Sequence, residues 1–238
     1  MSEKIGIKKA FILGGGKGER LMPLTKEIPK PLIEVKGKPI LQYNIELVKS
    51  FGVEEIVLGL GYLSEKIISY FEKKPIAGAK IVYSTEKEFL GTAGALKLAE
   101  KNFSKEEKFI MMNGDELKDV DFEKLNALHE KNNAIASIAL TEVEDTIHWG
   151  VVKLEKNKIL EFVEKPKSSE APSNLINSGA YILSGKIFEL IPEKKFSSIE
   201  REIFPKISGQ GKLFGCKCVT KWMPTDTIEK LNYAKKNW

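Results

Sequence analysis

A glycine-rich run, directly after the first strongly apolar stretch, constrains this chain of 238 residues more than any other feature. Residues 10–13, Ala-Phe-Ile-Leu, have the pattern of a short buried strand. Four glycines follow within five positions and let the backbone turn away from a sheet edge; they are Gly14, Gly15, Gly16 and Gly18. Such a turn can present several backbone N–H groups to a phosphate. Lys17, Arg20 and Lys30 add positive charge nearby, so the run indicates a polyphosphate site.

Three other interpretations of this run fit its residues less well. A Walker loop requires Gly-Lys followed by Ser or Thr, whereas Glu19 follows the last glycine here. A dinucleotide-binding fingerprint requires GxGxxG that opens directly into a helix, but the spacing differs, and Pro23, Pro29 and Pro31 prevent a long regular helix. A flexible surface turn explains the glycines but not the proline- and lysine-rich segment after them. We therefore favour phosphate binding.

The rest of the chain alternates predicted strands and helices. In the first half, the patterns predict helices over 39–51, 64–71 and 92–101 and strands over 55–60, 79–83 and 109–112. Gly52 is predicted to cap the C-terminus of the first helix, and Ser64 to cap the N-terminus of the second. The second half is richer in strands, at 134–140, 150–154, 159–163, 177–183 and 213–219, with short helices at 185–190 and 199–207. This predicts an α/β fold, a Rossmann-like mixed, mostly parallel sheet with helices on both faces, which binds ligands at the carboxyl ends of its strands.

The glycine run resembles the signature of the sugar-phosphate nucleotidylyltransferases, the NDP-sugar pyrophosphorylases. Their pattern is Gly-Gly-x-Gly-Thr-Arg-Leu-x-Pro-Leu-Thr followed by Pro-Lys-Pro, and this chain has Glu19 in place of the first threonine. Further motifs of that family follow in its order across almost the whole chain, at 90–96, 113–115, 149–152, 164–166, 177–181 and 198–202. The resemblance is greatest to the mannose-1-phosphate guanylyltransferase branch.

The resemblance implies a single nucleotide-diphospho-sugar transferase domain over 1–238, without a C-terminal β-helix. Its halves would be a nucleotide-binding part at 1–115 and a sugar-phosphate-binding part at 116–238. The implied reaction is Mg²⁺-dependent transfer of a nucleotidyl group from an NTP to a sugar 1-phosphate, which gives an NDP-sugar and pyrophosphate. GTP with mannose 1-phosphate is the first expectation, and dTTP or UTP with glucose 1-phosphate the next. Two alternatives stay open: a non-catalytic regulatory subunit that binds nucleotide sugars, and a cytidylyltransferase that acts on a non-sugar phosphate.

The resemblance also implies roles for individual residues. Arg20 would bind the leaving pyrophosphate, and Lys30 would stabilise the reacting phosphates. The nucleotide-binding set comprises Leu13, Gly14, Gly15, Gly16, Gly18, Gly91, Thr92 and Gly94. The sugar-phosphate-binding set comprises Gly150, Glu164, Lys165 and Asn177. Because a sugar 1-phosphate oxygen is already anionic at neutral pH, no general base is needed, and His129 and His148 are expected to be surface or packing residues.

Two aspartates are candidate metal ligands. Asp115 follows a buried apolar strand at a glycine turn, where a carboxylate suits Mg²⁺, which takes one or two carboxylates and completes its shell with phosphate oxygens and water. A turn aspartate bonded to its own backbone is the alternative. The family's second metal aspartate lies in Trp-x-Asp-Ile-Gly-Thr-Pro, but Pro224 occupies its place here. Asp226, two residues further on, is either the second ligand or, with Glu229 three residues later, the N-cap of the last helix, and we favour the cap.

Charge and composition limit the classes of binding partner that this chain is expected to have. The net charge of +5 comes from lysines interspersed with glutamates, without the arginine and aromatic stripe of a nucleic-acid-binding protein. Cys216 and Cys218 would share one face of a strand, a poor disulfide geometry, and we interpret both as packing residues. No apolar run is long enough for a signal peptide or a membrane span, so we expect a cytoplasmic protein without a membrane partner. The oligomeric state stays open, and a homo-oligomer is compatible with the sequence.

Overall fold

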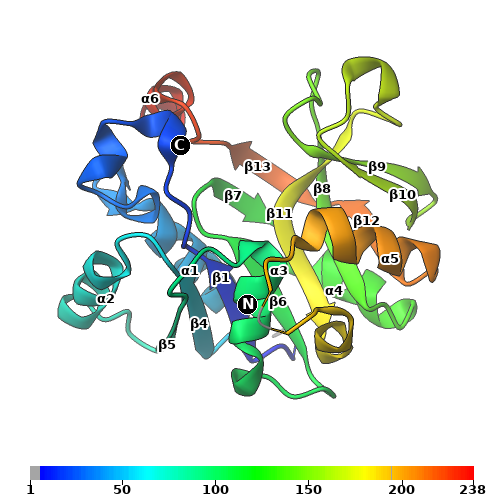
Figure 1. Cartoon of the computed structure of the whole chain (residues 1–238), viewed down its shortest axis with the longest axis horizontal. Coiled ribbons are helices and arrows are strands. Elements are labelled where there is room, and N and C mark those ends of the chain that lie inside the picture. The colour runs from blue at the N-terminus through cyan, green and yellow to red at the C-terminus, as the bar shows by residue number, and fades with distance from the viewer. Residues whose placement is uncertain (1–5, 194) are drawn as a thin grey trace.

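The computed structural model describes residues 6–193 and 195–238, and a nine-stranded sheet forms its centre (Figure 1). The strands of this sheet are β1 Lys9–Leu13, β4 Glu55–Leu60, β5 Lys80–Thr85, β6 Lys108–Asn113, β8 Ala136–Glu142, β9 Gly150–Glu155, β10 Lys158–Glu164, β11 Leu175–Ser184 and β12 Leu213–Lys217. Their order is β5-β4-β1-β6-β11-β8-β12-β10-β9. Two small sheets join β2 Glu34–Val35 with β3 Lys38–Pro39, and β7 Leu117–Val120 with β13 Val219–Met223.

The sheet is mixed, and its parallel part positions the loops of the first half. Strands β5, β4, β1 and β6 pair in parallel, so their carboxyl ends meet at one edge. Strand β11 is antiparallel to both β6 and β8, while β12 is parallel to β8, and β9 and β10 form a hairpin. The predicted α/β fold with a mixed sheet is therefore confirmed.

Helices cover both faces because side chains alternate along the strands. The helices are α1 Ile40–Ser50, α2 Ser64–Lys73, α3 Gly91–Leu98, α4 Phe122–Lys131, α5 Phe204–Gly209 and α6 Ile228–Asn237. On β1, Ala10 and Ile12 pack in one core cluster with residues of α1, α2 and α4, whereas Phe11 packs in the other with residues of α3 and α5. A third cluster joins Leu21 and Ile33 to Leu231 of α6. This third cluster fastens the segment after the glycine run to the C-terminal helix.

Local predictions about turns and ends had mixed outcomes. Gly52 adopts a φ of 95° two residues after the end of α1, and its N–H donates to the carbonyl of Lys49, as a C-terminal cap requires. The N-cap prediction for Ser64 is wrong, because α2 begins at Ser64 itself and Leu63 precedes it without a side-chain cap. The helix predicted over 199–207 is a π-helical turn, Ile199–Ile203, followed by α5, where Pro205 has no N–H for the usual bond.

The predicted strand over 213–219 divides between two sheets. β12 ends at Lys217 beside β8, and β13 begins at Val219 to pair with β7. Cys216 and Cys218 are free thiols, both buried in the cluster that contains α4, so the packing interpretation is confirmed. Among the described helices, none is both long and apolar enough to cross a membrane.

His129 on α4 is a buried packing residue and should make stability depend on pH. It is 5% exposed, and its Nδ1 lies 3.0 Å from the Ser137 hydroxyl. Burial, with a contribution from Lys108, lowers the pKa of His129 from 6.5 to about 4. Charging the ring therefore disfavours the folded state, and we expect the free energy of unfolding to fall by about 3 kcal/mol as the pH drops from 6.5 to 4. Urea unfolding at several pH values should show this fall for wild type but not for His129→Gln, and equal pH dependences would contradict it.

Candidate active site

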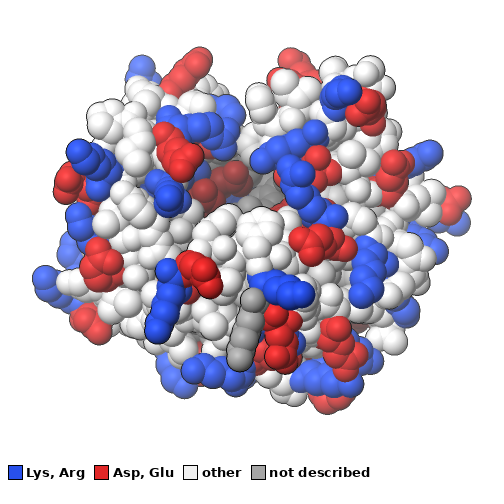
Figure 2. All heavy atoms as spheres, viewed as in Figure 1, with Lys and Arg blue, Asp and Glu red and all other residues white. Residues whose placement is uncertain are grey.

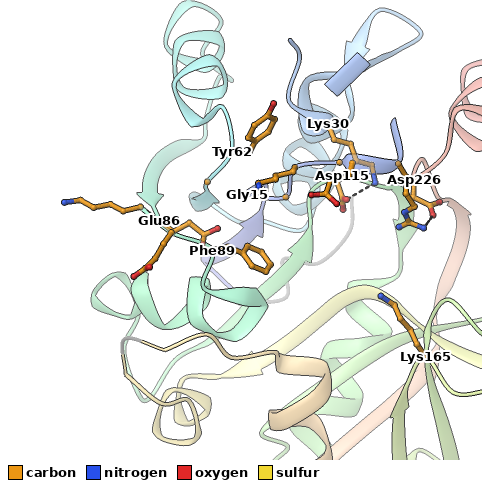
Figure 3. A pocket seen from close by; sticks show the side chains of 16 residues that line it. Gly15, Lys30, Tyr62, Glu86, Phe89, Asp115, Lys165 and Asp226 are labelled. Atoms are coloured by element: carbon orange, nitrogen blue, oxygen red, sulfur yellow. Dashed lines mark hydrogen bonds and ion pairs between the residues drawn. The ribbon is translucent and has the colours of Figure 1, made fainter. Parts of the chain in front are cut away.

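A cleft of about 960 Å³ opens where the parallel strands end. Figure 2 shows this face hollowed between two lobes, with acidic and basic side chains on both rims. Its walls are residues 15–20 and Lys30 after β1, Gly61 and Tyr62 after β4, residues 86–89 after β5, and Asp115 after β6. Lys165 and Asp226 close it from the second half of the chain (Figure 3). The loops after four neighbouring strands thus meet at one site, as the carboxyl-end rule predicts.

Glycine is required at different positions of the run for different structural reasons. A Cβ on Gly15 would lie 3.1 Å from the Gly61 nitrogen, so side chains are excluded where two loops approach closely. Gly18 has a φ of 63°, in the left-handed region, and its carbonyl accepts a 2.9 Å hydrogen bond from the Thr25 hydroxyl. A Cβ on Gly16 would meet nothing within 4 Å. Gly16 therefore lines the cleft without a packing constraint, which leaves its backbone accessible to a ligand.

Asp115 forms an ion pair with Lys30 at the centre of the cleft. The Gly114 N–H donates a 2.7 Å bond to the Leu13 carbonyl, which holds the ends of β6 and β1 together. The Lys30 ammonium donates to Asp115 Oδ2 at 2.8 Å, and the Lys30 side chain is only 6% exposed. Burial raises the pKa of Asp115, but the adjacent Lys30 charge outweighs this and lowers it below its ordinary value. Asp115 is therefore ionised at neutral pH.

Asp226 lies in the same cleft and is not a helix cap. Its carboxylate forms ion pairs with the Arg20 guanidinium and, at 3.0 Å, with the Lys230 ammonium. Thr227 caps α6 instead, since its hydroxyl accepts a hydrogen bond from the Lys230 N–H at 3.3 Å. The cap prediction for Asp226 is therefore wrong, because the helix starts one residue later than the spacing suggested and charged partners occupy the carboxylate.

A side-chain bond fixes the C-terminal segment beside Asp115. The Thr225 hydroxyl donates to the Asp115 carbonyl at 2.8 Å, and Thr225 itself is fully buried. This contact brings the residue after it, Asp226, to the cleft wall although Pro224 occupies the position of the expected aspartate. Burial raises the pKa of Asp226, but Lys230 and Arg20 lower it below the ordinary value, so it is charged at neutral pH.

The donor set fits a cation that shares its shell with other ligands. Asp115 and Asp226 supply carboxylate oxygens, the protein ligands that Mg²⁺ prefers. Within residues 6–193 and 195–238, no group of three or more His, Cys, Asp or Glu side chains could hold a metal by itself. A metal at this site would thus need phosphate oxygens and water to complete its coordination.

The nucleotide-binding prediction missed part of the cleft. Glu86, Tyr62 and Phe89 line it but carry no motif. Glu86 Oε2 accepts a 3.0 Å bond from the Leu90 N–H, and burial raises the pKa of Glu86 above its ordinary value. Their positions in the sequence could have identified two of these residues, because Tyr62 lies two residues after β4 and Glu86 directly follows β5.

Other predicted nucleotide residues contact protein instead of lining the cleft. A Cβ on Gly91 would lie 2.5 Å from the Ser197 carbonyl, and the Gly94 N–H donates to that carbonyl at 3.2 Å. The Thr92 hydroxyl donates to Glu200 at 2.6 Å. These residues start α3, directly after the 86–89 wall. Their direct role toward a nucleotide, like that of Leu13 and Gly14 behind the glycine turn, stays a prediction.

The predicted sugar-phosphate residues gather on the β9–β10 hairpin and β11. Gly150 and Glu164 are opposite each other in the hairpin, and Lys165 follows with its ammonium 3.7 Å from Glu164. Of this set, only Lys165 lines the cleft. Asn177 on β11 bonds within its own strand, to the Tyr181 hydroxyl and the Gly179 N–H, both at 2.8 Å. Burial, with repulsion from Glu200, raises the pKa of Glu164.

Comparisons with known proteins agree with this geometry. The family model described as nucleotidyl transferase matches residues 9–237. A mannose-1-phosphate guanyltransferase of Yarrowia lipolytica is 41% identical over 90% of this chain, which spans 60% of that relative's length. A UDP-glucose pyrophosphorylase complexed with UDP-glucose has a TM-score of 0.84 at 25% identity, with 97% of both chains covered. HddC from Yersinia pseudotuberculosis, complexed with GMP-PN, has a TM-score of 0.80 at 31% identity, with 97% of this chain and 99% of that one covered. The chain therefore belongs to the nucleotidyl transferase family.

Proposed function

We propose that this protein transfers a nucleotidyl group from an NTP to a sugar 1-phosphate, with release of pyrophosphate and with Mg²⁺ held by Asp115 and Asp226. One observation carries the proposal: a single cleft brings a glycine turn together with two ion pairs, Arg20–Asp226 and Lys30–Asp115. The family membership supports the reaction class. The position of Asp226 supports the proposed metal site despite Pro224, because its carboxylate lines the cleft two residues further along the chain.

The chain's own residues would act by alignment and by charge neutralisation. The accessible backbone of the glycine turn would hold the nucleotide phosphates, while Arg20 and Lys30 would compensate charge as pyrophosphate leaves. Lys165, across the cleft, would orient the sugar phosphate toward the α-phosphorus. When bound, Mg²⁺ would supply further charge neutralisation on the phosphates. No side chain needs to accept a proton, because the attacking phosphate oxygen is already anionic.

Guanine is the base we propose, on the chemistry of Glu86. A carboxylate only accepts hydrogen bonds, and guanine alone among the common bases presents two adjacent donors, N1–H and the 2-amino group. One Glu86 oxygen accepts a hydrogen bond from Leu90, and the other lies beside Gly15 and Gly61, two glycines that also line the cleft. Phe89, 67% exposed on the same wall, offers a ring on which a base can stack. The matched relatives named as guanylyltransferases support the same choice.

Replacing Glu86 should change base selectivity more than overall activity. In Glu86→Gln, an amide N–H faces one of the guanine donors, so we expect kcat/KM for GTP to fall about 10- to 100-fold relative to that for UTP. The matched control is Glu88→Gln, an exposed carboxylate two residues away on the same wall, which should keep the wild-type ratio. Steady-state kinetics with both nucleotides measure the effect. An unchanged ratio in Glu86→Gln would remove Glu86 from base recognition.

The reaction itself is tested by a matrix of substrates. Pyrophosphate release is measured with GTP, UTP, dTTP and CTP against mannose 1-phosphate, glucose 1-phosphate and a non-sugar phosphate, and products are identified by mass spectrometry. We expect GTP with mannose 1-phosphate to react fastest and to give GDP-mannose. Turnover only with CTP and the non-sugar acceptor would favour the cytidylyltransferase alternative. No turnover with any pair, together with binding of an NDP-sugar, would favour a regulatory subunit.

A further inference from the structure

Both aspartates that line the cleft, Asp115 and Asp226, form ion pairs with the chain's own cations. Asp115 is paired with Lys30 at 2.8 Å, drawn as a dashed line in Figure 3, and Asp226 is paired with Arg20. Arg20 and Asp226 are 206 positions apart in the sequence, so this pair joins the glycine run to the C-terminal segment. These are the same cations that the proposed reaction needs at the phosphates. One set of charges therefore has two competing uses.

The two ion pairs are built asymmetrically. The Arg20 side chain is 65% exposed, whereas its partner Asp226 is 6% exposed. In the other pair, Lys30 is 6% exposed and Asp115 is 41% exposed. Arg20 can therefore swing away through rotation of an exposed side chain, while Lys30 stays in the wall. Asp226 keeps Lys230 as a partner when Arg20 leaves, so the segment does not depend on Arg20 for its charge balance.

We propose that Arg20 and Lys30 act as stand-in cations at Asp226 and Asp115 when no substrate is bound, so that the cleft takes a divalent cation and a polyphosphate together in preference to either alone. The inference rests on the proposed metal role of the two carboxylates. It adds a coupling between metal and anion, carried by side chains that change partners.

Electrostatics gives the direction of this coupling. A divalent cation that arrives alone must displace Arg20 and approach the buried Lys30 charge, with no anion to compensate. A polyphosphate that arrives alone meets the carboxylates of Asp115 and Asp226 and finds Arg20 and Lys30 engaged with them, which leaves it only other cations of the cleft such as Lys17. With both ligands bound, Asp115 and Asp226 would hold the metal, while Arg20 would turn to the phosphate oxygens and Lys30 would face them from the wall. Each ligand thus raises the affinity for the other, as reciprocal linkage requires.

Removing the competing cation should therefore strengthen metal binding. Mn²⁺ is titrated calorimetrically, as a probe for Mg²⁺, into protein free of nucleotide and phosphate. We expect Arg20→Ala to bind Mn²⁺ about fivefold or more tightly than wild type, since coupling between sites commonly amounts to 5- to 150-fold. The matched control is Lys17→Ala, which removes an exposed cation of the same wall that makes no ion pair within the described residues. Lys17→Ala should change Mn²⁺ affinity less than twofold.

Pyrophosphate binding in the absence of metal is the second measurement, and here we expect the opposite effect of Arg20→Ala. In the presence of a chelator, Arg20→Ala and Lys17→Ala should both bind pyrophosphate more weakly than wild type, because each loses a cation of the cleft. Asp226→Asn frees Arg20 from its partner and should bind metal-free pyrophosphate more tightly. A higher Mn²⁺ affinity together with a lower pyrophosphate affinity in Arg20→Ala indicates a stand-in cation, because a general loss of structure would lower both affinities.

Two outcomes separate the inference from the function on which it rests. The stand-in role is overturned if Arg20→Ala binds Mn²⁺ no more tightly than wild type or does not bind it detectably. It is also overturned if Lys17→Ala shows the same gain in Mn²⁺ affinity. Failure of wild type to turn over any nucleotide and sugar phosphate overturns the proposed reaction, and this is read in a different assay. Tighter Mn²⁺ binding in Arg20→Ala that persists in Arg20→Ala/Asp226→Asn also counts against the inference, because the gain must come through Asp226.

Discussion

Asp115→Asn should reduce Mg²⁺-dependent pyrophosphate release by about a thousandfold or more and leave the fold intact. The substitution removes one of the two charged oxygen ligands proposed for a cation that prefers carboxylates. Metal stabilisation of reacting phosphates amounts to several kcal/mol, and each 1.36 kcal/mol corresponds to a tenfold change in rate. The fold should survive because the amide oxygen can still accept the bond from Lys30, which now spans 2.8 Å. Steady-state kinetics over a range of Mg²⁺ concentrations, with circular dichroism of the same samples, provide the measurement.

The control for this variant lies four residues further along. Asp119 is exposed on β7, outside the cleft, so Asp119→Asn makes the same chemical change without touching the site. It should retain near wild-type turnover. Near-normal pyrophosphate release by Asp115→Asn would remove Asp115 from catalysis and would leave its ion pair with Lys30 as a structural contact.

Elements bounded by clear turn residues could be predicted from the sequence. Strand β4 has the predicted limits, 55–60, because a short apolar run lies between Gly52 and Gly61. The division of the predicted 213–219 strand could not be predicted, since it depends on the pairing of β13 with β7, which lies about a hundred positions earlier in the chain. The N-cap of α2 also failed, because a serine at a plausible position carries no information about where the first helical bond forms.

Part of the candidate site could also be predicted from the sequence. Each loop that follows a parallel strand reaches the same edge, so the glycine run and Asp115 were expected together. The place of Asp226 depends on the buried Thr225 hydroxyl bonded to Asp115, a contact between segments 110 positions apart that no local pattern encodes. Local spacing therefore favoured a helix cap that Thr227 provides. The division at residue 116, the metal and the oligomeric state stay predictions.

We propose that Asp226 completes a metal site in which Pro224 stands where the family has an aspartate. A Mg²⁺ titration of pyrophosphate release tests this proposal most directly. For Asp226→Asn, we expect the Mg²⁺ concentration at half-maximal rate to rise about tenfold or more and kcat to fall about a hundredfold, because a neutral amide is a weaker ligand for a hard cation. The matched control is Thr227→Ala, which removes the real cap of α6 and should lower the free energy of unfolding by about 1 kcal/mol with an unchanged Mg²⁺ requirement. An Asp226→Asn enzyme with the wild-type Mg²⁺ requirement and rate would contradict the claim.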